Sequence, residues 1–158
     1  MGAVFERVSN AMKLLIQRVK NAQVHIDEQL YSSIGNGMLV FLGIHKNDGI
    51  NQIGWCVQKL VHLRIFSDQK NKMNLNVKDI NGEIMLVSQF TLYANCSKGR
   101  RPDYLDAAAP STAIPLYEEF MVQLKKEIGI VRSGKFGANM QISLINDGPV
   151  TLLIDSEQ

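Results

Sequence analysis

The sequence predicts a single α+β domain with a largely antiparallel, barrel-like sheet and two main helices packed on one side of it. The chain has 158 residues, 46% of them hydrophobic, which suits one domain with one core. Two segments have apolar residues at helical spacing, and several others have the period-two alternation or the short apolar runs of strands. The predicted order is strands, helix, strand, helix, strands, which is typical of α+β proteins.

Strand patterns occur along most of the chain. Residues 13–19 and 22–27 alternate apolar and polar side chains, as half-buried strands do. Residues 37–44 are almost wholly apolar and indicate a strand that is buried on both faces. Residues 84–94, IMLVSQFTLYA, give the strongest strand signal in the protein. The polar, Asn-rich residues 68–82 predict an excursion over the surface.

Two helices are predicted from apolar stripes. The first covers residues 50–66, with Asp48 as its N-cap. The second is capped by Ser111 or Thr112 and ends at Gly129. The apolar stripe of the first helix consists of Ile50, Ile53, Val57, Leu60 and Val61. The stripe of the second consists of Ile114, Tyr117, Phe120, Met121, Leu124 and Ile128.

The segment NDGPVT near the end of the chain contains an unusual proline. Apolar runs at residues 140–145 and 150–154 predict a strand on either side of it. Asp147 and Gly148 suit a hairpin turn between these strands. Pro149 does not suit the start of a buried strand, because it has no N–H to donate to a sheet. Taken alone, the segment indicates a tight turn.

Composition excludes several classes of protein. The longest apolar stretch, residues 38–44, is far shorter than the roughly 20 residues of a membrane-spanning helix. Glu6 and Arg7 interrupt the place where an export signal would have its apolar segment. Two cysteines, Cys56 and Cys96, fit a reduced cytoplasm. The net charge of +2 is too small for a protein that coats nucleic acid.

The sequence has no motif for a metal, a nucleotide or a serine hydrolase. His25, His45 and His62 lack the spacing and the nearby acidic or cysteine ligands of a zinc site, so we expect surface or supporting roles for them. No GxxxxGK[ST], GxGxxG or GxSxG pattern is present. We therefore assign no metal and no cofactor.

The strand pattern at residues 87–94 contains polar side chains that could carry chemistry. Strand alternation would put Ser88 and Phe90 on one face and Gln89 and Thr91 on the other. Their polar groups could satisfy neighbouring backbone groups inside a sheet. They could also hold an ester carbonyl and its developing oxyanion. The residue types alone leave both interpretations open.

The second polar feature is the run SKGRRPD. Lys98, Arg100 and Arg101 place three positive charges within four positions. Such a run can be a solvated loop, or it can bind phosphates through arginine hydrogen bonds and the lysine charge.

Three separated segments together resemble the D-aminoacyl-tRNA deacylases. They are VSQFTLYA, then KGRRPDY followed by AAAP and the helix around LYEEF, and finally FGANMQISLINDGPVT. IQRV and NGMLVFLGI extend the resemblance, which covers the chain from Met12 to about Ile154. The SQFTL-type segment and the Gly-Pro motif occur in the order that is typical of this family.

The resemblance implies an enzyme that hydrolyses the ester between a D-amino acid and the 3′-terminal adenosine of tRNA, with glycyl-tRNA as a further substrate. It implies a homodimer in the cytoplasm with active sites at the subunit interface, no membrane and no cofactor. The bond between Gly148 and Pro149 would be cis, and the motif of one subunit would enter the pocket of the other.

The resemblance also assigns roles to individual residues. The catalytic residues would be Ser88, Gln89, Phe90 and Thr91. Substrate binding and chiral selectivity would belong to Gly148, Pro149, Met140 and Phe136. Phosphates of tRNA would contact Lys98, Arg100 and Arg101. A selectivity filter of rigid backbone would reject an L side chain whatever its identity, and it would let glycine pass.

The attacking nucleophile has two candidates. Thr91 is one, but no base that could activate it is visible in the sequence. We favour a reaction in which the ribose hydroxyl beside the ester, or a water that it positions, attacks the carbonyl. Backbone N–H groups near Phe90 and Thr91 and the Gln89 amide would then stabilise the oxyanion.

Two other functions fit parts of the sequence. One is a non-catalytic, dimeric tRNA- or RNA-binding protein of the same fold, and the other is a hydrolase of small D-amino-acid esters or amides. Residues 1–11 precede Met12, where members of the family usually start. We expect an N-terminal extension or alternative start at 1–11 and a deacylase domain at 12–158, and we assign no function to the extension.

Overall fold

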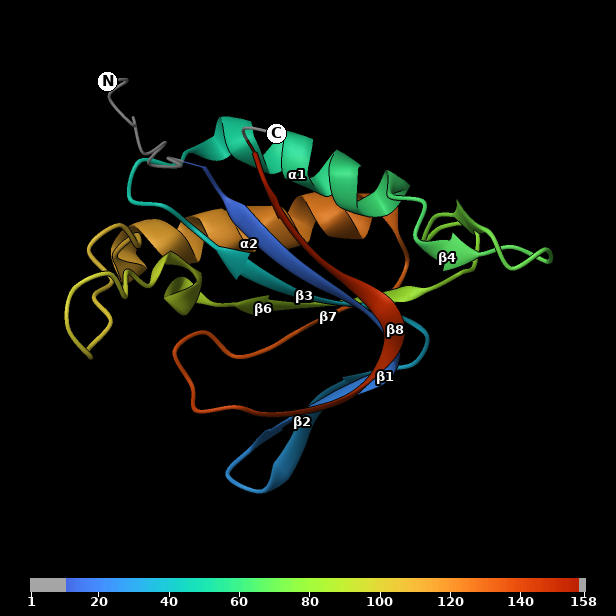
Figure 1. The fold of residues 1–158 in the computed structure, drawn as a ribbon, viewed down its shortest axis with the longest axis horizontal. Coiled ribbons are helices and arrows are strands. Elements are labelled where there is room, and N and C mark those ends of the chain that lie inside the picture. Colours follow the sequence, from blue (N-terminus) through green and yellow to red (C-terminus); the bar gives the residue numbers. More distant parts are fainter. Residues whose placement is uncertain (1–10, 157–158) are drawn as a thin grey trace.

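The computed structural model describes residues 11–156 and shows a curved sheet with two helices on one side (Figure 1). The predicted extension at residues 1–11 lies outside this part of the chain, except for its last residue. The strands are β1 (Lys13–Ile26), β2 (Gln29–Ile34), β3 (Gly37–Gly43), β4 (Phe66–Ser67), β5 (Met73–Leu75), β6 (Glu83–Ser88), β7 (Val131–Ser133) and β8 (Gln141–Asp155). The helices are α1 (Ile50–His62), the 3₁₀ turn η1 (Phe90–Tyr93) and α2 (Pro110–Glu127).

The main sheet confirms the predicted α+β class. Its strand order is β2-β1-β3-β6-β7, and β8 also pairs with β1. β1 is antiparallel to β2, β3 and β8, whereas the β3–β6 and β6–β7 pairs are parallel. The parallel pairs follow from the helices, because α1 lies in the connection from β3 to β6 and α2 in the one from β6 to β7.

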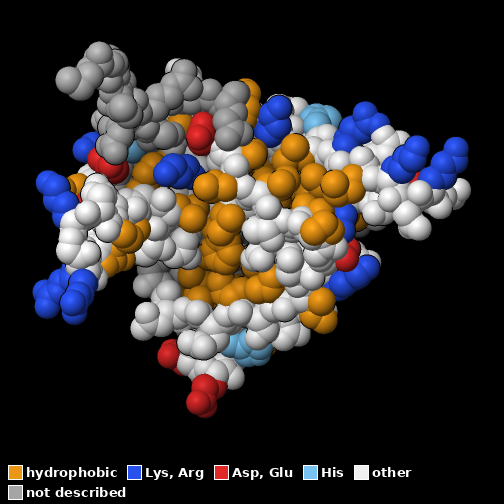
Figure 2. Space-filling model, in the orientation of Figure 1, with side chains coloured by type: hydrophobic (Ala, Val, Ile, Leu, Met, Phe, Trp, Pro, Cys, Tyr) orange, Lys and Arg blue, Asp and Glu red, His pale blue; other side chains and the backbone are white. Residues whose placement is uncertain are grey.

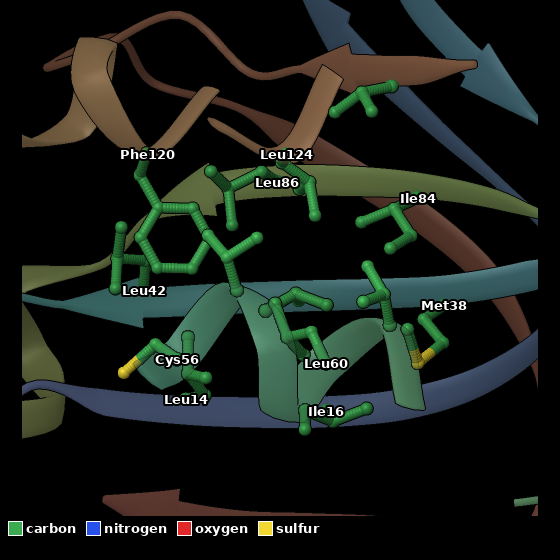
Figure 3. Packing of buried hydrophobic residues seen from close by; sticks show 14 of the residues in the cluster. Leu14, Ile16, Met38, Leu42, Cys56, Leu60, Ile84, Leu86, Phe120 and Leu124 are labelled. Atoms are coloured by element: carbon green, nitrogen blue, oxygen red, sulfur yellow. The ribbon is translucent and has the colours of Figure 1, made fainter. Parts of the chain in front are cut away.

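Hydrophobic cores lie on both faces of the sheet. On the helix side, Leu60 of α1 and Phe120 of α2 pack onto sheet residues such as Leu86, and all three are fully buried (Figure 3). On the other face, Leu39 and Met85 belong to a second cluster, which the curved ends of β1, β2 and β8 cover. β3 is therefore buried on both faces, as its apolar sequence predicts. None of the helices in residues 11–156 is long and apolar enough to cross a membrane.

Several predicted strands have different bounds in the structure. Residues 13–19 and 22–26 belong to one continuous strand, β1, because β8 pairs along both halves of it, and Asp27 lies in the turn that follows. Strands β2, β4 and β7 were not predicted, and the first helix ends at His62 instead of Phe66, which begins β4. The excursion at residues 68–82 does lie at the surface and contains β5, which pairs with β4. His25 lies in a strand and His62 in a helix as expected, but His45 is completely buried.

The helix caps differ from the predicted ones. The Asp48 carboxylate accepts a hydrogen bond from the backbone N–H of His45 at 2.7 Å instead of capping α1, whose N-cap is Gly49. Helix α2 begins at Pro110, so Ser111 and Thr112 lie inside its first turn. Proline suits this position, because the first N–H groups of a helix have no intrahelical acceptor.

The predicted hairpin at NDGPVT is wrong, because β8 runs through this segment as one strand. Asn146 pairs with Val19 and Thr151 with Gln17, so residues 147–150 bulge out opposite Arg18 alone. Neither Asp147 nor Gly148 has the positive φ of a hairpin turn. A bulge disturbs the pairing locally without ending the strand, so β1 remains the partner on both sides of it.

Candidate active site

A cavity of about 480 Å³ lies at the end of β6, beside the loop that leads into α2 and the loop between β7 and β8. Ser88, Gln89 and Phe90 contribute to one wall of this pocket, and Phe136 and Met140 to another. Sequence segments that are about 50 residues apart thus meet around one hollow. Five of the predicted site residues are brought together here.

The Ser88–Phe90 wall exists because β6 ends earlier than the sequence predicts. The backbone N–H of Gln89 still donates to Leu42 of β3 at 2.8 Å, but β3 ends at the next residue, Gly43. The chain then turns into η1, so the predicted alternation of side chains along residues 87–94 is wrong. Gly43 permits this packing, since a Cβ there would lie 3.0 Å from the Cβ of Leu92.

The turn after β6 brings polar groups of neighbouring residues together. The Gln89 amide donates a hydrogen bond to the Thr91 hydroxyl. Thr91 itself does not line the pocket. The backbone N–H groups of Phe90 and Thr91 open a 3₁₀ turn, and the first N–H groups of a helical turn have no partner within it. They are therefore available to a negatively charged oxygen.

Three aromatic rings, those of Phe90, Tyr104 and Phe136, contribute to the lining. Phe90 is 54% exposed and meets Tyr104 edge to face, with ring centroids 5.0 Å apart. Behind the pocket, Tyr117 of α2 contacts Phe136, and its hydroxyl donates to the backbone oxygen of Leu86 at 2.7 Å. Burial raises the pKa of Tyr117 to about 12, so this hydroxyl stays protonated at neutral pH and cannot act as a base.

The pocket contains no side chain that could act as a general base near neutral pH. Of the fourteen described residues that line it, none is Asp, Glu, His, Cys, Lys or Arg. Its polar side chains are those of Ser88, Gln89, Tyr104 and Asn139. Met140 reaches the lining because Gly134 leaves room for it, since a Cβ on Gly134 would lie 2.6 Å from the Met140 sulfur. The pocket can bind an apolar group and donate hydrogen bonds, but it offers little acid–base chemistry.

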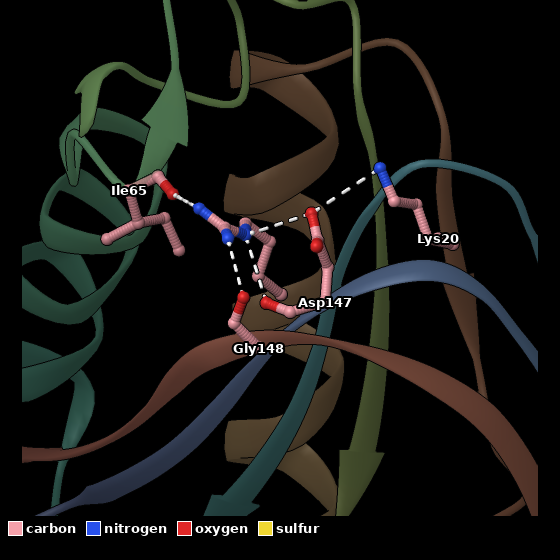
Figure 4. A network of polar contacts seen from close by, with 5 residues as sticks. Lys20, Ile65, Asp147 and Gly148 are labelled. Carbon is pink, nitrogen blue, oxygen red and sulfur yellow. Dashed lines mark hydrogen bonds and ion pairs between the residues drawn. The ribbon is translucent and has the colours of Figure 1, made fainter. Parts of the chain in front are cut away.

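The bulge in β8 is held in place by one buried cation (Figure 4). The Arg18 guanidinium donates to the backbone oxygens of Asp147 at 3.1 Å, Gly148 at 3.3 Å and Ile65 at 2.6 Å. It also pairs with the Asp147 carboxylate at 3.2 Å, which Lys20 approaches from solvent at 3.6 Å. The Gly148–Pro149 bond is cis, as the family resemblance implies.

The Gly148–Pro149 motif does not line the pocket of its own chain. Both residues are exposed. A Cβ added to Gly148 would meet only the Asn146 side chain, at 4.0 Å. Packing within the described chain therefore does not require a glycine at this position.

Comparison with known proteins assigns the chain to a family. The family model of D-Tyr-tRNA(Tyr) deacylase matches residues 15–155. The chain belongs to this family. A D-aminoacyl-tRNA deacylase of Protochlamydia amoebophila is 59% identical over 145 residues, which cover 92% of this chain and 96% of the relative. One of Thermosipho africanus is 52% identical over 147 residues and covers 93% and 99%.

The chain is also similar in fold to two solved structures. A protein described as c-Myc DNA Unwinding Element Binding Protein superposes with a TM-score of 0.85 at 39% identity, covering 90% of this chain and 97% of the other. A probable eukaryotic D-amino acid tRNA deacylase superposes with a TM-score of 0.81 over 92% and 99% of the two chains. At 17% identity, the second likeness shows the fold alone.

The basic run of this deacylase-family chain lies in the loop that leads to the pocket. Lys98, Arg100 and Arg101 are all exposed. Two backbone hydrogen bonds between Asn95 and Asp103, at 2.8 and 3.0 Å, close the base of this loop, and Tyr104 follows directly in the pocket lining. The three cations therefore project from the rim of the pocket.

Sequence reasoning missed three residues that shape the site. Arg18 is the cation that holds the bulge, and Tyr104 and Asn139 line the pocket. A signal for Arg18 was present, because a lone arginine interrupts the alternating strand pattern of β1. Tyr104 directly follows the basic run, but nothing in the sequence shows that its ring meets Phe90.

Proposed function

We propose that this protein hydrolyses the ester bond of D-aminoacyl-tRNA and releases a free D-amino acid and tRNA. The single observation that carries the proposal is the pocket at Ser88–Phe90. It is formed by the segments that resemble the family, in a chain 59% identical to a D-aminoacyl-tRNA deacylase. Its aromatic lining suits an adenosine ring, and its hydrogen-bond donors suit an ester carbonyl.

The substrate supplies the activating group in the proposed mechanism. The ribose hydroxyl beside the ester positions a water, which adds to the carbonyl carbon. The N–H groups of Phe90 and Thr91 and the Gln89 amide stabilise the oxyanion. The carbon–oxygen bond to the ribose then breaks, and a proton passes to the departing ribose oxygen. This scheme fits a pocket lining without an ionisable base.

Thr91 is not the nucleophile in this scheme. Its hydroxyl oxygen accepts a hydrogen bond from Gln89, which reduces its electron density, and no lining residue could take its proton. Thr91→Ala is expected to keep kcat within about fivefold of wild type, whereas a lost general base or nucleophile costs far more. A trapped acyl ester on Thr91 in the wild-type protein would refute the scheme.

Selectivity for D-amino acids belongs to Gly148 and Pro149 of a second subunit. Both residues are exposed and lie outside the pocket of their own chain, and Arg18 holds their backbone from behind. The backbone of this segment faces the substrate amino group and leaves no space for the Cβ of an L-amino acid. Glycine has no Cβ and is therefore hydrolysed too. Phe136 and Met140 contact the adenosine from the other wall of the pocket.

A homodimer is required for this arrangement, and the surface supports one. β8 is a 15-residue strand that pairs with β1 on one side only within the described chain, and a long free edge favours pairing with another chain. Leu30, Tyr31, Ile145 and Leu153 are large apolar residues of β2 and β8 that are about half exposed or more. Figure 2 shows hydrophobic side chains gathered in a band across this face of the molecule.

Lys98, Arg100 and Arg101 bind phosphates near the 3′ end of tRNA, since they project from the pocket rim. The enzyme works in the cytoplasm, where aminoacyl-tRNA is made and used.

Hydrolysis of three charged tRNAs tests the proposed function. The protein should deacylate D-tyrosyl-tRNA and glycyl-tRNA rapidly and leave L-tyrosyl-tRNA intact. Deacylation of the L substrate at the same rate would remove the selectivity claim, and deacylation of none would refute the enzymatic function. Heat-inactivated protein gives the background for spontaneous ester hydrolysis.

A second candidate is nucleic-acid binding without hydrolysis. It is favoured by the name of one similar structure, c-Myc DNA Unwinding Element Binding Protein, at 39% identity. The exposed basic loop could bind phosphates in either case. Uncharged tRNA or duplex DNA that binds tightly, with no turnover of any D-aminoacyl-tRNA, would favour this candidate.

A further inference from the structure

A second group of cations lies far from the pocket. Arg64 follows α1, and Lys70 and Lys72 lie in the turn between β4 and β5, so we call these three residues the hairpin patch. All three are exposed. Figure 2 shows Lys and Arg side chains gathered at the edge where Figure 1 places β4, opposite the end that carries η1. The proposed role of the basic loop does not include these charges.

Within residues 11–156, the ammonium groups of Lys70 and Lys72 make no ion pair or hydrogen bond, whereas the Arg64 guanidinium donates to the backbone oxygen of Asn74 at 2.9 Å. No carboxylate in this part of the chain forms an ion pair with any of the three. The carboxylate of Asp68, which lies in the same turn, instead accepts the backbone N–H groups of Lys70 at 2.8 Å and Lys72 at 3.0 Å. It fixes the turn while both ammonium groups remain directed to solvent.

The hairpin patch adjoins a hollow of about 400 Å³ that reaches the bulge of β8. Arg18, Lys20 and Asp147 line this hollow on one side, and Ser67 and Asn71 line it on the side of the hairpin. Arg18 also joins the two parts directly, because it donates to the backbone oxygen of Ile65 as well as to that of Gly148. The hairpin and the Gly148–Pro149 segment are thus fixed relative to each other.

We propose that the hairpin patch binds the phosphate backbone of the tRNA whose 3′ end lies in the partner subunit's pocket. The inference rests on the proposed function, in which Gly148 and Pro149 enter that pocket. A surface fixed beside them must then lie beside the same tRNA. The basic loop of one subunit and the hairpin patch of the other would flank one acceptor end.

The chemistry of the patch favours a nucleic-acid backbone as the ligand. Three exposed cations with one engaged carboxylate give a positive surface, and Gln69, Asn71 and Asn74 add neutral groups that can hydrogen-bond to phosphate and ribose oxygens. A backbone contact of this kind carries no sequence information. It therefore suits an enzyme that must act on many tRNAs.

A double substitution tests the patch with two substrates. Lys70→Gln with Lys72→Gln removes two charges and keeps the Asp68 contacts, which use backbone N–H groups. For D-tyrosyl-tRNA at low salt, kcat/KM should fall about five- to tenfold, mostly through KM, and the salt dependence should weaken, because two phosphate contacts are lost. For D-tyrosyl-adenosine, which has no phosphate, both constants should stay at the wild-type values.

A matched control separates local contacts from net charge. Lys125→Gln with Lys126→Gln removes the same charge from exposed positions of α2 that line neither hollow. This control should retain kcat/KM for both substrates within about twofold, as expected for charges that are screened from the ligand. An equal loss in the two double variants, or no loss in either, would overturn the proposal. A wild-type protein that hydrolyses neither substrate would refute the proposed function and the inference with it.

Mixed dimers test whether the patch acts on the partner's pocket. In the first mixed dimer, one subunit carries Lys70→Gln and Lys72→Gln, and the other is inactivated by Gln89→Ala. The intact pocket of the first subunit then faces the intact hairpin of the second. This dimer should show half of the wild-type kcat with a wild-type KM. In the second mixed dimer, one subunit carries all three substitutions and the other is wild type. The intact pocket of the wild-type subunit then faces the altered hairpin, and KM should rise. The opposite pattern would show action within one subunit and overturn the assignment.

Discussion

The pocket is lined mostly by apolar side chains, whereas the Asp147–Pro149 segment presents backbone that a buried arginine holds from behind. Among the described residues that line the pocket, the Tyr104 phenol is the only ionisable group. At the bulge, the Asp147 carboxylate lies 3.2 Å from the Arg18 guanidinium and 3.6 Å from the Lys20 ammonium group. Charged side chains therefore surround the bulge, whereas the described lining of the pocket, where the ester is proposed to react, has none.

The difference shows how the two tasks can be divided. A reaction that uses the ribose hydroxyl of its substrate needs hydrogen-bond donors in fixed positions, which the end of β6 and η1 provide. Selection against a Cβ needs atoms that do not move aside, and backbone is stiffer than a side chain with free rotamers. The two parts lie on separate segments, so each can be altered while the other stays intact.

The largest effect is expected from Arg18→Met. The arginine side chain is 8% exposed, and its loss leaves the Asp147 carboxylate and backbone oxygens without their donor. The free energy of unfolding should fall by about 2 to 3 kcal/mol, below the usual cost of breaking a fully buried pair, because Asp147 is one-third exposed. Urea denaturation of the wild type and the variant at the same protein concentration measures this difference in the free energy of unfolding.

Lys20→Gln is the matched control for Arg18→Met. Lys20 approaches the same carboxylate at 3.6 Å but is 60% exposed, so its removal should change stability by less than about 0.5 kcal/mol. If the two substitutions destabilised the protein equally, Arg18 would not be the residue that holds the bulge.

Gly148→Ala should separate activity from stability. A Cβ at this position meets nothing in its own chain closer than 4.0 Å, so the free energy of unfolding should change by less than about 1 kcal/mol. If this backbone meets the substrate in the partner's pocket, the added methyl group should lower kcat/KM for D-tyrosyl-tRNA about 100-fold, since small displacements at a reacting centre have effects of this size. Unchanged kcat/KM would remove Gly148 from the site.

The sequence allowed the fold class, both helices and five residues of the pocket lining to be predicted, because apolar periodicity and local motifs are properties of short segments. Contacts between distant segments could not be predicted in this way. The end of β6 depends on where β3 ends, and the single strand β8 depends on the length of β1. In both cases a partner strand decides a boundary that the local pattern places elsewhere.

The candidate site shows the same limit. Ser88 and Gln89 were noticed as polar residues in an apolar segment, the family resemblance added Phe90, and the structure places all three in the pocket lining. Their arrangement was wrong, because strand alternation was extended into a 3₁₀ turn. The cap of α1 was wrong for a similar reason, since Asp48 binds the backbone of His45 and leaves the cap position to Gly49.

A smaller effect at neutral pH than that of Arg18→Met is expected behind the pocket, from Tyr117→Phe. The variant loses the hydrogen bond to Leu86, so its free energy of unfolding at about pH 8 should fall by about 1 kcal/mol. Burial raises the pKa of Tyr117 to about 12, from an ordinary value near 10. Below pH 10 the hydroxyl is neutral in both states and its contribution is complete.

Between pH 10 and 12 the Tyr117 hydroxyl ionises in the unfolded chain first, which favours unfolding of the wild type by up to roughly 2 to 3 kcal/mol. The variant lacks this loss, so the difference in stability should shrink with rising pH and reverse near pH 11. Deacylation of D-tyrosyl-tRNA at neutral pH should remain close to wild type, because the hydroxyl faces Leu86 and not the pocket. Stability curves that stay parallel to pH 11 would show that burial does not raise the pKa of Tyr117. A large loss of kcat would instead place a working acid or base beside the pocket and contradict the contrast with the charged bulge.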